Sequence, residues 1–118
     1  MTEFLYHYKM TVTKVVDGDT ICGDVDLGFN FGVKKMEFRF TGINTPETKG
    51  ETRTAGLASK KYVEDLILNK EICVLTKKDA KEKYGRYLAT VYYLTSDNTW
   101  VSLNEELVTK GLAVPFMS

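Results

Sequence analysis

The stretch that decides the fold reads Arg39-Phe40-Thr41-Gly42-Ile43-Asn44-Thr45-Pro46-Glu47. Apolar and polar residues alternate over residues 36–41, a period of two that is typical of a strand with one buried face. Arg39 then lies on the face away from the core. Gly42 weakens the strand, and Pro46 holds Thr45 in an extended conformation, so the strand ends here. An arginine, an amide, a backbone carbonyl and a carboxylate therefore gather at one strand end, a set that suits a phosphate with a hard metal ion.

Upstream of this stretch, the same alternation predicts a strand over residues 6–16, and residues 21–27 are predicted to return as a second strand. Asp17-Gly18-Asp19-Thr20 between them is a tight turn, because aspartate side chains bond to their own backbone and Gly18 supplies permissive dihedral angles. A second turn follows over residues 28–32. The first half is therefore predicted to be a three-stranded antiparallel meander.

Downstream, the period changes to that of a helix over residues 54–69, after a polar loop over 48–53. Strands are predicted over 72–75 and 86–94, with a charged loop over 77–83 between them. The residues expected on the inward face of the helix are Ala55, Ala58, Tyr62, Val63, Leu66 and Ile67.

Ser102-Leu103-Asn104-Glu105 is a capping box, which predicts a second helix that stops at Gly111. Its inward residues are expected to be Leu103, Leu107 and Val108, and residues 112–118 are expected to trail off. Five strands with one helix after the third and another after the fifth are the element order of an OB-fold, a five-stranded Greek-key β-barrel with helices (α+β) that is used on nucleic acids. We expect one domain over residues 1–118, because no repeat or linker interrupts the chain.

The composition bounds the possible functions. Hydrophobic residues make up 43% and charged residues 27% of 118 residues, which excludes a disordered chain. Lys+Arg and Asp+Glu are equal at 16 each, which argues against tight nonspecific binding of nucleic acid but allows a local basic groove. Two cysteines fit neither a disulfide framework nor a zinc site. A single histidine, His7, excludes Ser-His chemistry unless it serves itself.

The start of the chain lacks a basic segment followed by an apolar one, so no signal peptide is visible. The chain is expected to be intracellular, or secreted with a leader removed. No apolar run approaches membrane length, and no membrane contact is expected.

Three polar clusters have both a plain and a chemical interpretation. Asp17 and Asp19 either only shape their turn, or Asp19 offers an oxygen to a hard cation such as Ca²⁺ with Asp17 behind it. Asn44, Thr45 and Glu47 either end a strand or belong to a metal-dependent hydrolase, which needs a metal, a base and fixed cations facing developing negative charge.

The third cluster, Lys83-Tyr84-Gly85-Arg86, either leads a loop into a strand or presents a second arginine opposite Arg39. Because a guanidinium grips two phosphate oxygens at once, such a pair would clamp a phosphodiester.

Taken in order, these motifs resemble the staphylococcal (micrococcal) nuclease family, the thermonucleases. The likeness runs from about Thr13 to Ala113. It rests on Asp17-Gly18-Asp19-Thr20, Arg39 through Glu47, Lys83-Tyr84-Gly85-Arg86, and Asn104-Glu105-x-Leu107-Val108 with Gly111-Leu112-Ala113.

The resemblance implies a Ca²⁺-dependent phosphodiesterase that cuts DNA and RNA, single strands preferred, and leaves 3′-phosphate ends; a monomer is expected. Asp19, Asn44 and the Thr45 carbonyl would be Ca²⁺ ligands. Glu47 would act as general base or orient the attacking water, and Arg39 and Arg86 would stabilise the pentacoordinate phosphorane. Lys83 and Tyr84 would hold a neighbouring phosphate, and Leu88 would lie beside the base.

The chain departs from the family in two places. Asn44 stands where the family has a metal-binding aspartate, so a higher Ca²⁺ requirement is expected. The family's pocket-lining tyrosines and last helix are not matched before Ser118, and Phe116 either supplies part of a stacking surface or belongs to the core.

Two other functions fit the sequence. The first is a weak or inactive nuclease-like module that only binds single-stranded nucleic acid, which Asn44 favours; Arg39, Glu47 and Arg86 favour the enzyme. The second is a general oligonucleotide-binding barrel that uses aromatic residues on its strands.

Overall fold

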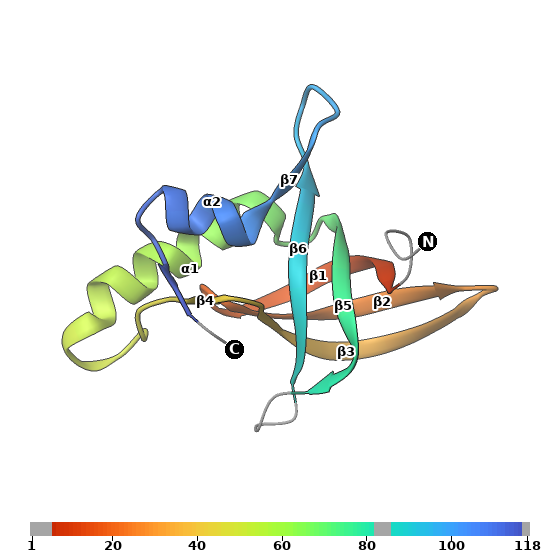
Figure 1. Cartoon of the computed structure of the whole chain (residues 1–118), viewed down its shortest axis with the longest axis horizontal. Coiled ribbons are helices and arrows are strands. Elements are labelled where there is room, and N and C mark those ends of the chain that lie inside the picture. The colour runs from red at the N-terminus through yellow and green to blue at the C-terminus, as the bar shows by residue number, and fades with distance from the viewer. Residues whose placement is uncertain (1–5, 82–85, 117–118) are drawn as a thin grey trace.

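Five strands close into a barrel. The structure, a computed structural model, describes residues 6–81 and 86–116. β1 (His7–Asp17), β2 (Thr20–Gly28) and β3 (Phe31–Phe40) form the predicted antiparallel meander. β5 (Glu71–Lys81) pairs with β1, and β6 (Tyr87–Leu94) pairs with β5. β6 also pairs in parallel with β3, and this last pairing closes the barrel (Figure 1).

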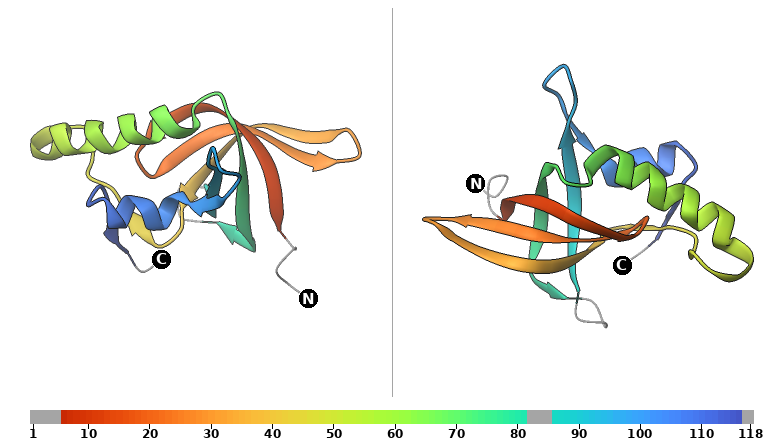
Figure 2. Two further views of the ribbon diagram at one scale, coloured as in Figure 1. Left: turned by 90° about the horizontal axis from the view of Figure 1, so that it is seen from above. Right: turned by 180° about the vertical axis from the view of Figure 1, so that it is seen from behind.

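Shorter elements complete the fold. They are β4 (Ile43–Asn44), a 3-10 helix (Gly50–Thr52), α1 (Arg53–Ile67), β7 (Trp100–Ser102), α2 (Leu103–Thr109) and β8 (Val114–Pro115). α1 follows the third barrel strand and α2 follows the fifth, so the predicted OB-fold is confirmed. Both helices lie toward one end of the barrel, while the β2–β3 hairpin extends away at the other (Figure 2). None of the described helices is both long and apolar enough to cross a membrane.

The barrel interior is filled by the inward residues of every strand and by one side of each helix. Phe38 and Phe40 of β3 are buried, as their alternation with Arg39 predicts. The fully buried large side chains also include Met10, Val12, Ile21, Val63, Ile67, Ile72, Val74, Val91, Leu103 and Leu107.

Two predicted boundaries are wrong. Residues 77–81 were expected in a loop, but β5 runs to Lys81; its pairing with β6 is irregular between Thr76 and Lys81 and ends with the Lys81–Tyr87 pair. The segment after Gly111 was expected to trail off, but β8 pairs antiparallel with β4, and the Phe116 amide donates to the Gly42 carbonyl at 2.8 Å. The β4–β8 pairing depends on a partner remote in sequence, since Ile43 pairs with Pro115, whereas Lys81 and Tyr87 are six positions apart.

The buried stripe of α1 also differs from the prediction. Val63 and Ile67 are buried as expected, but Ala55 and Ala58 are exposed. The other buried positions are Gly56 and Ser59, the small residues that let the start of the helix lie close to the loop after β4.

Glycine at position 18 is explained by the limited space around it and not by its backbone conformation, since the φ of Gly18 is not positive. A Cβ there would lie 2.8 Å from the Ser59 Cβ.

α2 begins as the capping box predicts, with the Ser102 hydroxyl accepting from the Glu105 amide at 3.3 Å. Leu103 and Leu107 are buried as predicted, and Val108 is half-buried. Asn104 is buried as well: its amide oxygen accepts from the Val91 amide, and its nitrogen donates to the carbonyls of Thr41 and Ala89. This side chain therefore fastens α2 to β6 and to the segment that leaves β3.

Candidate active site

The predicted cluster forms where β3 leaves the barrel and β4 begins. Arg39 Nη2 lies 2.9 Å from Asn44 Oδ1 and 3.5 Å from Asp19 Oδ2. Asp19 is 7% exposed although it sits in the β1–β2 turn. Its Oδ2 also accepts from the Thr45 amide at 3.1 Å. Asp19, Arg39, Asn44 and Thr45, separated by up to 26 positions in the chain, are therefore in mutual contact.

Arg39 is held firmly by its own turn. Its Nη1 donates to the carbonyls of Phe40 and Ile43, each at 3.0 Å, in addition to the bond from Nη2 to Asn44. The side chain is 14% exposed. A guanidinium fixed in this way is preorganised, so it does not lose conformational entropy when an anion arrives.

Arg86 reaches the same place from the start of β6. Its Nη1 donates to the Thr20 hydroxyl at 3.2 Å, and that hydroxyl donates to Asp19 Oδ1 at 3.2 Å. Its Nε lies 3.8 Å from Glu37 Oε2. The two arginines are thus linked through Thr20 and Asp19 and belong to one site.

Glu47 and Asp17 lie on the loop side of the cluster. Glu47 is exposed, and no ion pair or hydrogen bond to its carboxylate is found within residues 6–81 and 86–116. Its backbone is fixed, because its carbonyl accepts from the Thr52 hydroxyl at 2.9 Å and a Cβ on Gly56 would lie 2.2 Å from it. Asp17 Oδ1 accepts from the Thr48 hydroxyl at 3.3 Å, which ties the β1–β2 turn to this loop.

Leu88 and Phe116 flank Arg39. Leu88 is half-buried and stands in register with Arg39 on the neighbouring strand, so both side chains project from the same face of the sheet. The Phe116 ring is 47% exposed, and the Arg39 Cζ lies 5.6 Å from its centroid, within the range of a cation–π contact. Phe116 therefore lies at the site and not in the core. Lys83 and Tyr84 fall outside the described residues.

The predicted Ca²⁺ ligands fit the ion in kind. The Asp19 carboxylate, the Asn44 amide and the Thr45 carbonyl offer only oxygen, which hard cations prefer. The set carries one negative charge, and the Asp19 and Asn44 oxygens both face Arg39 Nη2. Across the described part of the chain, no group of three His, Cys, Asp or Glu side chains is placed to hold a metal. Three oxygens with one negative charge are fewer than the roughly six to eight oxygens that Ca²⁺ takes.

Sequence reasoning missed three residues that shape the site. Thr20 joins Asp19 to Arg86, and Glu37 contacts Arg86 from the outward face of β3. The alternation of Glu37 with Arg39 was a usable signal, since residues two apart share a face. Gly56 gave no local signal, because only the packing of α1 against Glu47 requires a glycine there.

The sequence is similar to a known protein family and to several relatives. The sequence model of the family described as "Staphylococcal nuclease homologue" matches residues 37–117. The chain is 32% identical to a thermonuclease of Staphylococcus hyicus and 32% identical to one of Staphylococcus intermedius, in each case over 86% of this chain and 56% of the relative. It is 29% identical to an uncharacterized protein of Methanocaldococcus jannaschii, over 95% of this chain and 61% of the relative. The chain thus spans 56–61% of the length of these relatives.

Proposed function

Because the chain belongs to the family of staphylococcal nuclease homologues, we propose that it is a Ca²⁺-dependent phosphodiesterase, an endonuclease that cuts DNA and RNA and leaves 3′-phosphate ends. Membership of this family implies nucleic acid as the substrate class. The metal, the products and a preference for single strands are the finer parts of the proposal.

The main support for the proposal is the position of the two arginines. Arg39 and Arg86 come from different strands, yet both contact the Asp19–Thr20 pair, Arg39 through Asp19 and Arg86 through Thr20. Two guanidinium groups at one mouth of a barrel are suited to a phosphodiester, whose transition state spreads negative charge over several oxygens. A module that only binds nucleic acid needs no such preorganised pair.

In this proposal Asp19, Asn44 and Thr45 would hold the Ca²⁺, which would supply positive charge against the negative charge that develops in the transition state. Arg39 and Arg86 would donate to the other phosphate oxygens, Arg39 through its Nε hydrogen or by exchanging its bond to Asn44 for one to the phosphate. Glu47 takes a proton from the attacking water, or orients the water while solvent takes that proton; the water oxygen bonds to phosphorus while the bond to the 5′-oxygen breaks, the 5′-oxygen takes up a proton from solvent, and the phosphate stays on the 3′-oxygen. The exposed carboxylate of Glu47 on a fixed backbone supports this role.

The alternative is a nuclease-like OB module that binds single-stranded nucleic acid without cutting it. Asn44 favours it, because an amide in place of a carboxylate removes one charge from the metal ligands. The alternative predicts retarded but intact nucleic acid in a gel.

The test is incubation of denatured DNA with the protein and Ca²⁺, repeated with a chelator. Fragments that appear only with Ca²⁺ support the enzyme, and Glu47→Ser is expected to slow cutting at least about 100-fold, the usual contribution of a general base. Arg39→Gly should abolish cutting too, but it also removes bonds that hold the turn.

Glu51→Ser is the matched control, since Glu51 is an exposed glutamate in the adjacent 3-10 helix. It should leave the rate unchanged. If folded Glu47→Ser still cuts DNA at the wild-type rate, the role assigned to Glu47 is rejected. If the wild type cuts equally well with the chelator, the dependence on Ca²⁺ is rejected.

A further inference from the structure

A long hairpin projects from the barrel, and its tip is apolar. We call residues 24–35 the β2–β3 arm. β1 pairs with β2 only as far as Asp26, and β6 pairs with β3 only from Phe38 to Phe40, so the arm extends past both neighbours (Figure 1). At its tip Leu27, Phe29, Phe31 and Val33 are 46%, 94%, 71% and 40% exposed. Residues 27–33 include no charged side chain.

Turn chemistry does not explain this tip. Phe29 and Asn30 form the two-residue turn with φ of 55° and 64°. Asparagine tolerates a positive φ, but a bulky phenylalanine there is strained, and Asn-Gly or Asp-Gly are the usual choices. A large, strained and almost fully exposed ring gives the fold no stabilisation, and this points to a partner.

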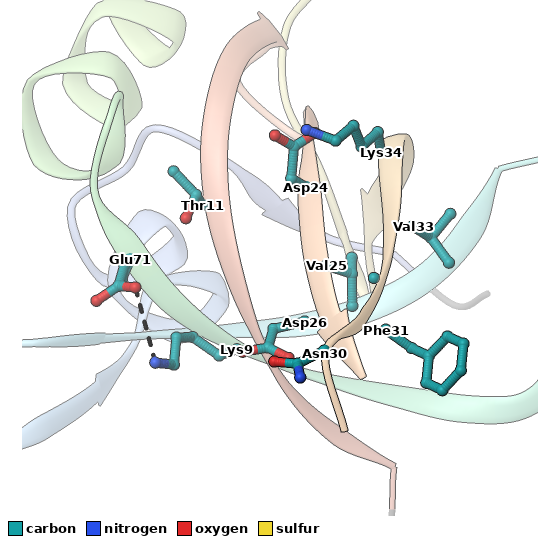
Figure 3. Close-up of a pocket in the computed structure, with 11 residues that line it drawn as sticks. Lys9, Thr11, Asp24, Val25, Asp26, Asn30, Phe31, Val33, Lys34 and Glu71 are labelled. Carbon is teal, nitrogen blue, oxygen red and sulfur yellow. Dashed lines mark ion pairs between the residues drawn. The ribbon is translucent and has the colours of Figure 1, made fainter. Parts of the chain in front are cut away.

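The acidic residues of the arm are engaged by the arm itself. Asp24 Oδ1 accepts from the Lys35 amide at 3.2 Å, and Asp26 Oδ1 accepts from the Gly28 amide at 2.8 Å. Beside them lies an open pocket of about 500 Å³, in which Lys9 pairs with Glu71 at 3.7 Å (Figure 3). Phe31 points away from these charges in the same view.

The arm is continuous with the candidate active site. Thr20 and Arg39 pair at the other end of the same two strands, and Gly28 at the tip lies eight positions after Thr20 in β2. At 3.3 Å per residue this is about 26 Å. OB-folds bind oligonucleotides on the face of strands 2 and 3, and a single OB-fold covers about 4–16 nucleotides. A strand seated at the arginines is therefore long enough to reach the tip.

We propose that the β2–β3 arm is a second contact for single-stranded nucleic acid, in which Phe29 and Phe31 stack on bases remote from the bond that is cut. The proposal builds on the proposed function but requires binding and not cutting. Exposed Lys34 and Lys35 follow the tip and attract the phosphates.

Strand pairing with a second copy is disfavoured. Residues 31–37 of β3 form a partly free edge, but it carries these two lysines and an irregularity at Lys35, whose φ is 58°. Charged residues and bulges are features that prevent edge strands from pairing between molecules.

The test is fluorescence anisotropy with thymidine oligomers of about 4 and 16 nucleotides in the presence of a chelator. The wild type is expected to bind the longer oligomer more tightly. Phe29→Asn, which suits the positive φ, and Phe31→Ala should each weaken binding of the longer oligomer at least about fivefold and leave the shorter one unchanged.

Trp100→Ala is the control, because Trp100 is a 55% exposed aromatic on another hairpin; both oligomers should bind it as they bind the wild type. Unchanged affinity of Phe29→Asn for the longer oligomer overturns the proposal. A second assay measures sedimentation with phosphatidylcholine–phosphatidylserine vesicles. If the wild type sediments with them and Phe29→Asn does not, while Phe29→Asn still binds both oligomers, the tip binds a membrane instead. Length-dependent binding through the arm without cleavage retains this inference and rejects the proposed nuclease.

Discussion

At the scale of single residues, the site depends on one nitrogen of Arg39 that faces both Asp19 and Asn44. Asn44 Oδ1 accepts from Nη2 at 2.9 Å, and Asp19 Oδ2 lies 3.5 Å from the same atom. An aspartate at position 44 would keep this geometry and strengthen the bond, since charge-assisted hydrogen bonds are the stronger kind. In the proposed metal site, an aspartate at position 44 would therefore add one negative charge without moving Arg39.

Asn44→Asp is expected to lower the Ca²⁺ dissociation constant by at least about tenfold, because a unit charge about 4 Å from a cation near a protein surface is worth a few kcal/mol. Calorimetric titration with Ca²⁺ measures this directly, and the half-saturating Ca²⁺ for cleavage should fall in parallel. Asn30→Asp, on the β2–β3 arm, is the control and should bind Ca²⁺ as the wild type does. Equal affinity of Asn44→Asp and the wild type contradicts the assignment of Asn44 as a ligand.

At the scale of elements, α1 places Glu47 through one close approach. The helix begins at Arg53, and its buried Gly56 lies against the Glu47 carbonyl. Ser59, one turn further on, donates to the Leu112 carbonyl at 2.6 Å and lies next to Gly18. One face of α1 thus sets the position of the β1–β2 turn, the loop after β4 and the C-terminal segment.

Gly56→Ala tests this packing. Alanine in a helix normally stabilises by up to about 1 kcal/mol, but a Cβ 2.2 Å from a backbone oxygen forces a displacement that costs about 1–3 kcal/mol. We expect a lower free energy of unfolding in denaturant titrations and slower cleavage, because Glu47 moves. Ala58→Gly, on the exposed side of the same helix, should lose about 1 kcal/mol and keep the cleavage rate. A more stable Gly56→Ala would refute the close approach.

At the scale of the whole molecule, one carboxylate joins both helices to the barrel. Glu106 of α2 accepts hydrogen bonds from Tyr62 of α1 and Tyr93 of β6. The bond to Glu106, followed by burial, raises the pKa of Tyr62 from 10.0 to about 12. Burial, followed by the bond to Glu106, raises the pKa of Tyr93. Because the protonated phenols are favoured in the folded state, folding is linked to these protons.

The stabilisation from Tyr62 and Tyr93 is fully present below pH 10, where both are protonated in the unfolded chain as well. As pH rises from 10 through about 12, the unfolded chain loses these protons first, so the free energy of unfolding falls. Denaturant titrations across this range should show the fall in the wild type. The fall should be smaller in Glu106→Gln, whose amide lacks the charge that opposes ionisation of the phenols. A Glu106→Gln profile parallel to the wild type is the contradicting outcome.

Much of the fold could be predicted because the signals that specify it are local. Alternation predicted β1 and β3, the turn after Val16 predicted β2 as the return strand, residues with high β-propensity predicted β6, and the capping box at Ser102 predicted α2. The length of β5 could not be predicted, because its last residues are mostly charged and carry no alternation of apolar and polar residues. The exposed Ala55 and buried Gly56 were missed for a similar reason: helical periodicity gives a face, but the neighbour decides which face is buried.

By itself the sequence determined the element order, the family and a short set of polar residues able to handle a phosphate. Only the tertiary structure decided that Arg86 meets Thr20 across 66 positions, that Glu37 contacts Arg86, and that Phe116 lies over Arg39. It also showed that the apolar side chains at the tip of the β2–β3 arm are exposed. The physical reason is that alternation and capping act within a few residues, whereas closing a barrel brings together side chains whose separation along the chain carries no signal.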